Sequence, residues 1–149
     1  MMKLLLIILA LAFLLAILYL ILIIPRFRKP NYQPLLHPYY AHRGLHNTAR
    51  GIPENSMKAF QEAVAGGYGI ELDVQLSKDE IPVVFHDSNL RRMCGVDANV
   101  SSLSLDELKR LSLGGTQERI PTFQEFLEMV DGRVPLIVEI KMEKRNDRI

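Results

Sequence analysis

The chain has 149 residues, and its 18 Lys and Arg residues against 17 Asp and Glu residues give a formal net charge of +1 at pH 7. This length allows one folded domain, not two. The near-neutral balance, together with the lack of any zinc-finger, RNP-like or basic-helix pattern, gives no support for a nucleic-acid partner. A single cysteine, Cys94, excludes an internal disulfide and a zinc site built from cysteines.

The N-terminal segment is apolar without a break over residues 4–24, where only Tyr19 is partly polar. As a helix it would be roughly 32 Å long, which spans a bilayer core of about 30 Å. A cleaved signal peptide and a buried helix are the alternatives. The run is longer than a typical cleavable segment and is not followed by a small-x-small cleavage site. We therefore predict a membrane protein with one N-terminal transmembrane anchor over residues 4–24.

The side of the membrane on which the rest of the chain lies stays open. Three positive residues follow the apolar run and only Lys3 precedes it, which slightly favours a cytoplasmic C-terminal part. A very short N-terminal tail is, however, also typical of anchors that send a domain outside.

Residues 25–38 contain four prolines and are predicted to be an extended linker. The folded domain is predicted over residues 39–149.

Within this domain the hydrophobic pattern predicts short strands that alternate with helices. In chain order these are a strand at 39–41, a helix capped by Asn55 or Ser56, strands at 69–76 and 82–85, helices opened by capping boxes at Ser104 and Thr122, and a strand at 135–140. Residues 88–102 are predicted to be loop. This alternation favours an α/β fold with a parallel sheet covered by helices.

The strand at 69–76 carries two carboxylates on one face. Its apolar residues alternate with Glu71, Asp73 and Gln75, so Glu71 and Asp73 point the same way. With Glu139 from the last strand they would form an oxygen site for a divalent cation, Ca²⁺ or Mg²⁺. The alternative is that Glu71 and Asp73 lie on the solvent-facing side of an edge strand.

Charged pairs stand at the ends of several strands, as the reacting groups of α/β barrels do. His42 and His86 could act as general acid and base, although a lone histidine is more often a surface or core residue. Arg43 and Lys141 could bind a phosphate, or simply form salt bridges to neighbouring carboxylates. A metal ion, two imidazoles and two cations together indicate phosphoester cleavage.

Six segments resemble the glycerophosphodiester phosphodiesterase family in order and spacing, and the chain looks like its membrane-anchored bacterial type. They are His42-Arg43-Gly44, Pro53-Glu54-Asn55-Ser56, Glu71-Leu72-Asp73-Val74, Pro82-Val83-Val84-Phe85-His86-Asp87, Ile120-Pro121-Thr122 and Glu139-Ile140-Lys141. The resemblance implies a TIM (β/α)8 barrel and an enzyme that hydrolyses glycerophosphodiesters to glycerol 3-phosphate and an alcohol. Its attacking group would be water or the substrate's own glycerol hydroxyl.

The resemblance also assigns roles to single residues. It implies a divalent cation held by Glu71, Asp73 and Glu139, with His42 and His86 as acid and base. Arg43 and Lys141 would contact the phosphate or the substrate, and Glu54 would support the metal site.

Two local departures and the length separate this chain from the family pattern. Glu80 stands where the family often has glycine, and Arg91-Arg92-Met93-Cys94-Gly95 replaces the family's Arg-x-Thr-Gly segment. A TIM barrel takes at least about 200 residues. We therefore interpret residues 39–149 as the N-terminal half of such a barrel, from a truncated product that could be inactive alone; pairing of two copies is the alternative.

Two other functions stay open at this point. One is a membrane-tethered half-barrel without catalysis, which would only bind a metal or a partner. The other is a related lipid phosphodiesterase of the phospholipase D-like branch.

Overall fold

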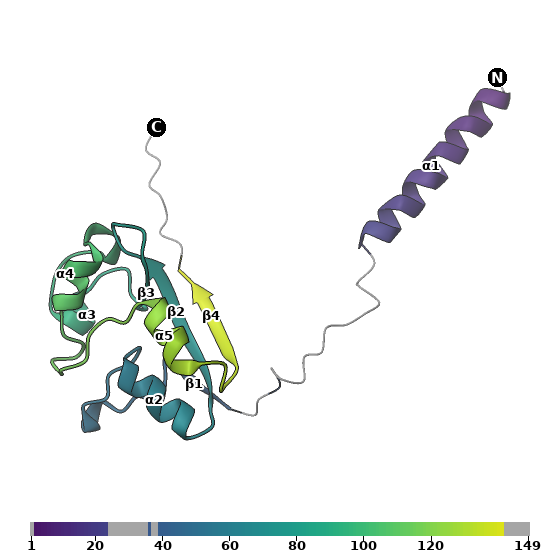
Figure 1. The fold of residues 1–149 in the computed structure, drawn as a ribbon. Helices are drawn as coiled ribbons and strands as arrows, with labels where there is room; N and C mark the ends of the chain where they lie inside the picture. Colours follow the sequence, from purple (N-terminus) through teal and green to yellow (C-terminus); the bar gives the residue numbers. More distant parts are fainter. Residues whose placement is uncertain (1, 24–35, 37–38, 142–149) are drawn as a thin grey trace. The chain divides into compact units, whose positions relative to one another are not determined.

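The computed structural model describes residues 2–23, 36 and 39–141 (Figure 1). The chain divides into two units, Met1–Tyr32 and Gln33–Ile149. The first contains helix α1 (Met2–Ile23), whose 22 residues are long and apolar enough to cross a membrane. Its bounds agree with the predicted apolar segment, except that Ile24 lies outside the described residues, as do 25–35 and 37–38 of the predicted linker.

The second unit is built on a sheet whose central strand is β2 (Gly69–Leu76). Strands β1 (Tyr40–His42) and β4 (Leu136–Ile140) pair with β2 in parallel. Backbone hydrogen bonds from Arg43 to Glu71 and from Phe85 to Asp73 place β1 and β3 (Pro82–Val84) along the same edge of β2. The opposite edge of β2 pairs with β4.

Strand β3 corrects the prediction of a wholly parallel sheet, because it runs antiparallel to β2. The link between them covers only residues 77–81, whereas a parallel connection needs a crossover of about a dozen residues. Within residues 39–141 the parallel part of the sheet therefore has three strands, not four.

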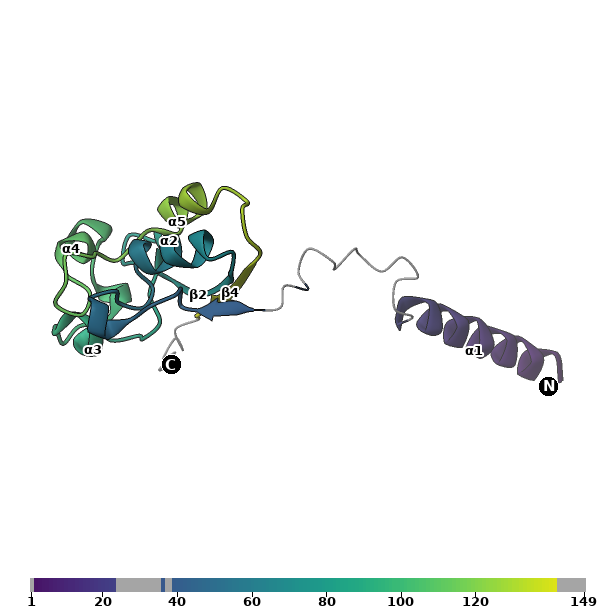
Figure 2. The same cartoon turned by 90° about the horizontal axis from the view of Figure 1, so that it is seen from below.

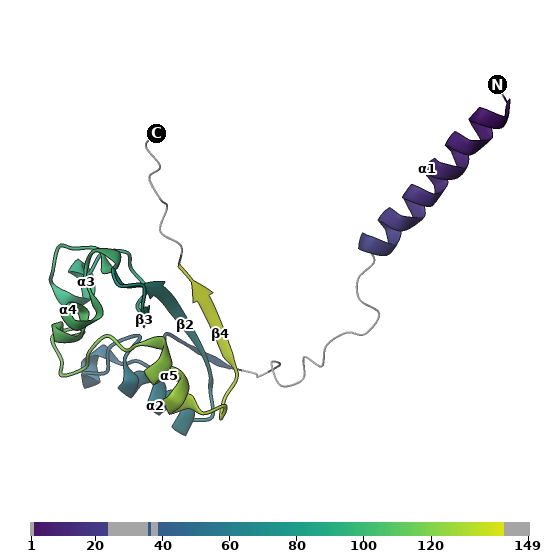
Figure 3. The same ribbon diagram turned by 45° about the horizontal axis from the view of Figure 1, so that its top comes forward.

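Two helices cover one face of this sheet (Figures 1 and 3). Helix α2 (Met57–Ala65) begins at the Ser56 cap, and α5 (Phe123–Val130) begins at a complete capping box formed by Thr122 and Glu125. Phe60 of α2 meets Phe126 of α5 edge to face, with ring centroids 4.6 Å apart. Ile70, Leu72 and Val74 of β2 are buried in the same core. The odd-numbered residues of β2 consequently face away from these helices.

Residues 86–121 form short helices and loops, and their buried residues share a second core with Val83 and Phe85 (Figure 2). This segment contains α3 (Arg91–Cys94), a 3-10 turn η3 (Val100–Ser102) and α4 (Leu105–Arg110), whose predicted capping box at Ser104 is present. The prediction that 88–102 is only loop is therefore wrong in part. Helix α3 has four residues and no side-chain cap, so it leaves no periodic pattern. A further short 3-10 turn, η2 (Thr48–Arg50), precedes α2.

Candidate functional site

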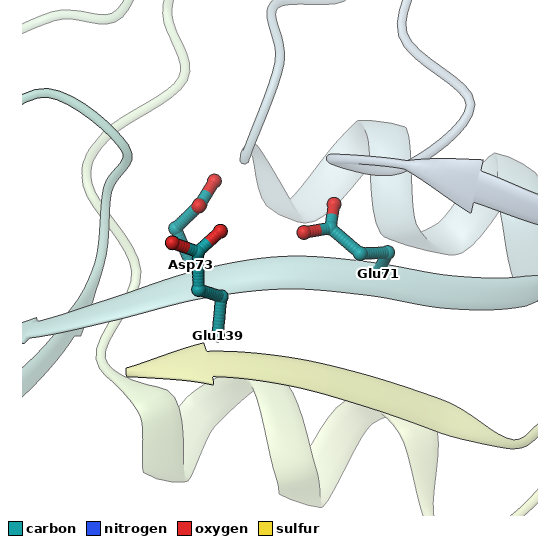
Figure 4. A group of neighbouring side chains, drawn as sticks. All are labelled: Glu71, Asp73 and Glu139. Atoms are coloured by element: carbon teal, nitrogen blue, oxygen red, sulfur yellow. The ribbon is translucent and has the colours of Figure 1, made fainter. Parts of the chain in front are cut away.

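The register of the parallel strands brings the predicted carboxylates together. Asp73 of β2 lies opposite Glu139 of β4, and Glu71 of β2 lies opposite His42 of β1. All three carboxylates rise from the same side of the sheet (Figure 4), and each offers an oxygen within 4.8 Å of the other two. One shared register and the two-residue alternation of β2 are enough to produce this cluster.

Asp73 is the most enclosed of the three, since only 1% of its surface is exposed. A buried carboxylate needs compensating partners. The Asn55 side-chain amide donates a hydrogen bond of 3.2 Å to Asp73 Oδ2, and Arg43 Nε lies 3.4 Å from the same oxygen. Lys141 Nζ lies 3.1 Å from Asp73 Oδ1. Because β2 is paired on both edges, the edge-strand alternative is wrong.

Lys141 joins two carboxylates of the cluster. Its ammonium group donates a 2.6 Å hydrogen bond to Glu139 while contacting Asp73. Burial alone would lower the pKa of Lys141, but the hydrogen bonds to Glu139 and Asp73 outweigh burial and raise the pKa. The cluster therefore already holds a cationic group between two of its oxygens.

His42 and Arg43, at the end of β1, lie next to the carboxylate cluster. His42 is exposed, and its Nε2 lies 3.7 Å from Glu71 Oε2. Arg43 adopts a left-handed backbone conformation with φ of 58°, which is costly for a residue with a side chain. Its backbone N–H donates to the Glu71 carbonyl at 2.8 Å and to Glu71 Oε2 at 3.3 Å. Its side chain donates to Glu54 at 2.8 Å.

His86 is fixed from the same face of β2. The Gln75 amide, two residues beyond Asp73, donates to the carbonyls of Phe85 and Asp87 at 2.8 and 2.9 Å. These two bonds flank His86 and hold its backbone. His86 Nδ1 and Asp87 Oδ1 are 2.6 Å apart. Along β2, then, Glu71 contacts His42, Asp73 contacts the cations, and Gln75 secures His86.

Arg92 is a site residue that the sequence analysis missed. It donates from Nε to Asp87 at 2.6 Å and from Nη2 to Glu54 at 2.6 Å. The hydrogen bond from Arg92 is the main cause that lowers the pKa of Asp87 to about 2. Burial would raise the pKa of Glu54, but the hydrogen bonds from Arg92 and Arg43 together lower it.

Gln75, Asn55 and Asp87 were likewise not among the predicted site residues. Their positions in the sequence could have identified them, since each lies one or two residues from a predicted site residue. For Arg92 the sequence position gives no such indication, because its contact with Glu54 joins residues 38 positions apart.

The charges of the site do not balance among the described residues. Five carboxylates face three permanent cations, which leaves an excess of two negative charges; the carboxylates belong to Glu54, Glu71, Asp73, Asp87 and Glu139, and the cations to Arg43, Arg92 and Lys141. Carboxylate oxygens are the ligands that Ca²⁺ and Mg²⁺ prefer. Both the donor set and the excess charge therefore fit one divalent cation.

Comparison with known proteins agrees with this arrangement. Residues 42–149 match the model of the glycerophosphoryl diester phosphodiesterase family. The chain is 40% identical over 109 residues to a glycerophosphodiester phosphodiesterase of Caldanaerobacter subterraneus, covering 68% of this chain and 44% of that protein. It is 37% identical over 131 residues to a lysophospholipase D of Rattus norvegicus, covering 75% of this chain and 41% of that protein.

The fold is likewise that of solved family members. A phosphodiesterase from Oleispira antarctica, solved in complex with the product sn-glycerol-3-phosphate, superposes with a TM-score of 0.63 at 35% identity, over 72% of this chain and 46% of that one. This confirms the predicted fold class, part of a TIM (β/α)8 barrel. The chain spans less than half the length of the relatives it matches. With its family model matched over residues 42–149, the chain belongs to the glycerophosphoryl diester phosphodiesterase family.

Proposed function

We propose that this protein takes part in the metal-dependent hydrolysis of glycerophosphodiesters to glycerol 3-phosphate and an alcohol. The observation that carries the proposal is the convergence of three carboxylates from β2 and β4 within 4.8 Å, next to His42 and beside the segment that holds His86. The bound product of the Oleispira antarctica relative supports the substrate class.

Glu71, Asp73 and Glu139 are the residues that would hold Ca²⁺ or Mg²⁺. Their oxygens suit a hard cation, and Lys141 already stands between two of them as a positive group. When bound, such a cation stabilises negative charge on phosphoryl oxygens and on the oxygens that attack or leave.

The two histidines divide the proton transfers of hydrolysis. One imidazole takes the proton of the attacking oxygen, from water or from the substrate's own hydroxyl, as that oxygen bonds to phosphorus. The other, as imidazolium, gives a proton to the departing alkoxide as its bond to phosphorus breaks. Where the substrate's own hydroxyl attacks, the product of this step is a cyclic phosphate, and water opens it in a second step, with the two imidazoles exchanging roles, to give glycerol 3-phosphate. In His86 the Nδ1 atom is engaged by Asp87, so Nε2 is the nitrogen left to exchange a proton with the substrate.

Arg43 and Lys141 are proposed to bind the phosphate. Both lie beside Asp73, where a phosphate bridging to the cation would meet their positive charge. Glu54 is proposed to support the site by holding Arg43, to which it is joined at 2.8 Å.

Helix α1 is proposed to be a single-pass N-terminal anchor over residues 4–24, joined by the linker 25–38 to the catalytic part at 39–149. The length and apolar composition of α1 support this assignment. An anchored site of this kind would work on phosphodiesters at or near a membrane surface.

A second candidate substrate is a lysophospholipid. The similarity to a mammalian lysophospholipase D, which extends over 131 residues, favours it specifically. The chemistry at phosphorus would be the same, with a monoacyl glycerol phosphate as the product in place of glycerol 3-phosphate. Assays on both substrates distinguish the two candidates.

The test is the release of glycerol 3-phosphate from glycerophosphocholine with Ca²⁺ or Mg²⁺. Two proteins are assayed: the full 149-residue chain in detergent, and a chimera in which residues 42–141 replace the matching segment of the Caldanaerobacter relative. We expect Glu71→Ala in the chimera to lower kcat by about 100-fold or more, because a cation ligand is lost.

The matched control is Glu128→Ala on α5, an exposed glutamate outside the site, which should leave kcat unchanged. Full activity of Glu71→Ala would refute the assignment of the site. A chimera that binds the cation but turns over neither phosphodiester would favour a non-catalytic role.

A further inference from the structure

We propose that Arg92 is a positioning residue that sets the orientation and tautomer of His86 by clamping Asp87 to Glu54. The inference rests on the proposed function, in which His86 exchanges a proton with the substrate. It concerns the segment 91–95, to which the sequence analysis assigned no role.

Every nitrogen of the Arg92 guanidinium group is engaged. Nε donates to Asp87 Oδ2 at 2.6 Å, and Nη2 donates to Glu54 Oε1 at 2.6 Å and to Asp87 Oδ1 at 3.2 Å. Nη1 donates to Glu54 Oε2 at 3.1 Å and lies 3.3 Å from Met93 Sδ. Arg92 therefore makes a two-pronged contact with each of two carboxylates, and no nitrogen is left over to bind a phosphate.

The clamp joins the segment that carries His86 to the loop that holds Arg43. Asp87 follows His86 directly and contacts its Nδ1 at 2.6 Å. Glu54 lies in the loop before α2 and holds Arg43, which contacts Asp73 of the carboxylate cluster. The series His86, Asp87, Arg92, Glu54 and Arg43 is thus one connected set of hydrogen bonds. It links the proton-carrying histidine to the carboxylates of the metal site.

The chemical consequence lies in which nitrogen of His86 carries the proton. An ionised Asp87 whose Oδ1 faces Nδ1 accepts a hydrogen bond from Nδ1–H, so neutral His86 keeps Nε2 free. Arg92 holds both oxygens of Asp87, which fixes the plane of that carboxylate. Without Arg92, Asp87 can rotate, and the preference for the Nδ1–H tautomer weakens.

The residue next to Arg92 in the sequence gives a matched control. Arg91 has the same side chain, but it pairs with Asp97 at the surface, and its side chain is 70% exposed. An effect on His86 that arises only from losing a positive charge on α3 would be the same for Arg91→Ala and Arg92→Ala. An effect of the clamp would be confined to Arg92.

The first test uses NMR of the full 149-residue chain in detergent, with ¹⁵N-labelled histidine and the His86 signals assigned through His86→Gln. The wild type and Arg91→Ala should show neutral His86 as the Nδ1–H tautomer, whereas Arg92→Ala should show a mixture of tautomers. This readout needs no turnover, so it decides the inference even if no phosphodiester is hydrolysed. The same tautomer in Arg92→Ala as in the wild type overturns the inference.

The second test measures kinetics in any form of the protein that shows the proposed activity. Arg92→Ala should lower kcat about 10- to 100-fold, as expected of a misplaced catalytic group, and change KM little. Arg92→Lys keeps the positive charge, but a lysine cannot form bidentate hydrogen bonds with both carboxylates. We therefore expect this variant to show a partly lowered kcat and a weaker preference of His86 for the Nδ1–H tautomer. If Arg92→Ala does not fold, Arg92→Lys decides: wild-type kcat and tautomer in that variant overturn the inference.

Discussion

At the scale of single residues, the site depends on how its buried carboxylates are compensated. Asp73 is enclosed and contacts Arg43, Asn55 and Lys141, whereas Asp87 and Glu54 share Arg92. Removing a partner of Asp73 is costly, because its charge is then left buried with less compensation. Removing Arg92 costs less, because Asp87 and Glu54 are only partly buried. The same contacts that orient the proposed site residues therefore also contribute to the stability of the fold.

The Asp87–Arg92 pair predicts a loss of stability in acid. The pKa of Asp87 is lowered from 3.8 to about 2 in the folded chain, whereas an unfolded aspartate has a pKa of about 3.9. Since the folded pKa is the lower one, the stabilisation is present above pH 4 and is lost as the pH falls towards 2. Because the Arg92 side chain is 48% exposed and solvent screens the pair, we expect this loss to be on the order of 1 kcal/mol.

The measurement is urea unfolding of the full chain in detergent between pH 5 and pH 2, followed by circular dichroism. In Asp87→Asn, the free energy of unfolding should fall less between pH 5 and pH 2 than in the wild type, because the contribution of Asp87 is absent. Asp97→Asn is the control, because Asp97 pairs with Arg91 at an exposed surface and such pairs contribute little. If Asp87→Asn unfolds with the pH dependence of the wild type, Asp87 is not stabilised by Arg92.

At the scale of elements, local patterns predicted the strands and the longer helices well. The alternation of apolar and acidic residues in β2 is sufficient to place Glu71 and Asp73 on one face, and Ser104 and Thr122 do open capped helices. Both features depend on residues a few positions apart. The direction of β3 follows from the short link at 77–81, which the sequence already showed and the parallel prediction overlooked. The short helix α3 and the reach of Arg92 to Glu54 depend on tertiary packing, which no local period encodes.

The turn between β2 and β3 contains a residue with a strained backbone, and a substitution can relieve this strain. Glu80 has φ of 61°, a left-handed conformation that glycine adopts without cost. This explains why a glycine suits the position at which this chain has a glutamate. We expect Glu80→Gly to raise the free energy of unfolding by up to about 1 kcal/mol.

Urea unfolding of the full chain in detergent measures this effect, with Glu80→Ala as the control. The side chain of Glu80 is exposed, so Glu80→Ala removes the carboxylate but keeps the strain and should be close to neutral. A Glu80→Gly variant less stable than Glu80→Ala would show that the entropy of the unfolded chain outweighs the relief of strain.

At the scale of the whole molecule, α2 and α5 cover one face of the sheet, and the residues of the proposed site lie on its other face. Sequence resemblance predicted the barrel fold, which the comparison with solved structures confirms. The strand register explains why the proposed site residues Glu71, Asp73 and Glu139 lie close together. Both histidines, the three carboxylates and the cations lie within one unit, Gln33–Ile149, in its described residues 39–141. The central claim is that this face holds a divalent cation for phosphodiester hydrolysis.

Isothermal titration of Ca²⁺ and Mg²⁺ into the full chain in detergent tests that claim most directly. We predict that the wild type binds one cation per chain, that Glu139→Gln weakens binding at least about tenfold, and that Glu128→Gln, which alters an exposed glutamate of α5, binds as the wild type does. Absence of binding by the wild type, or equal binding by Glu139→Gln, would contradict the claim.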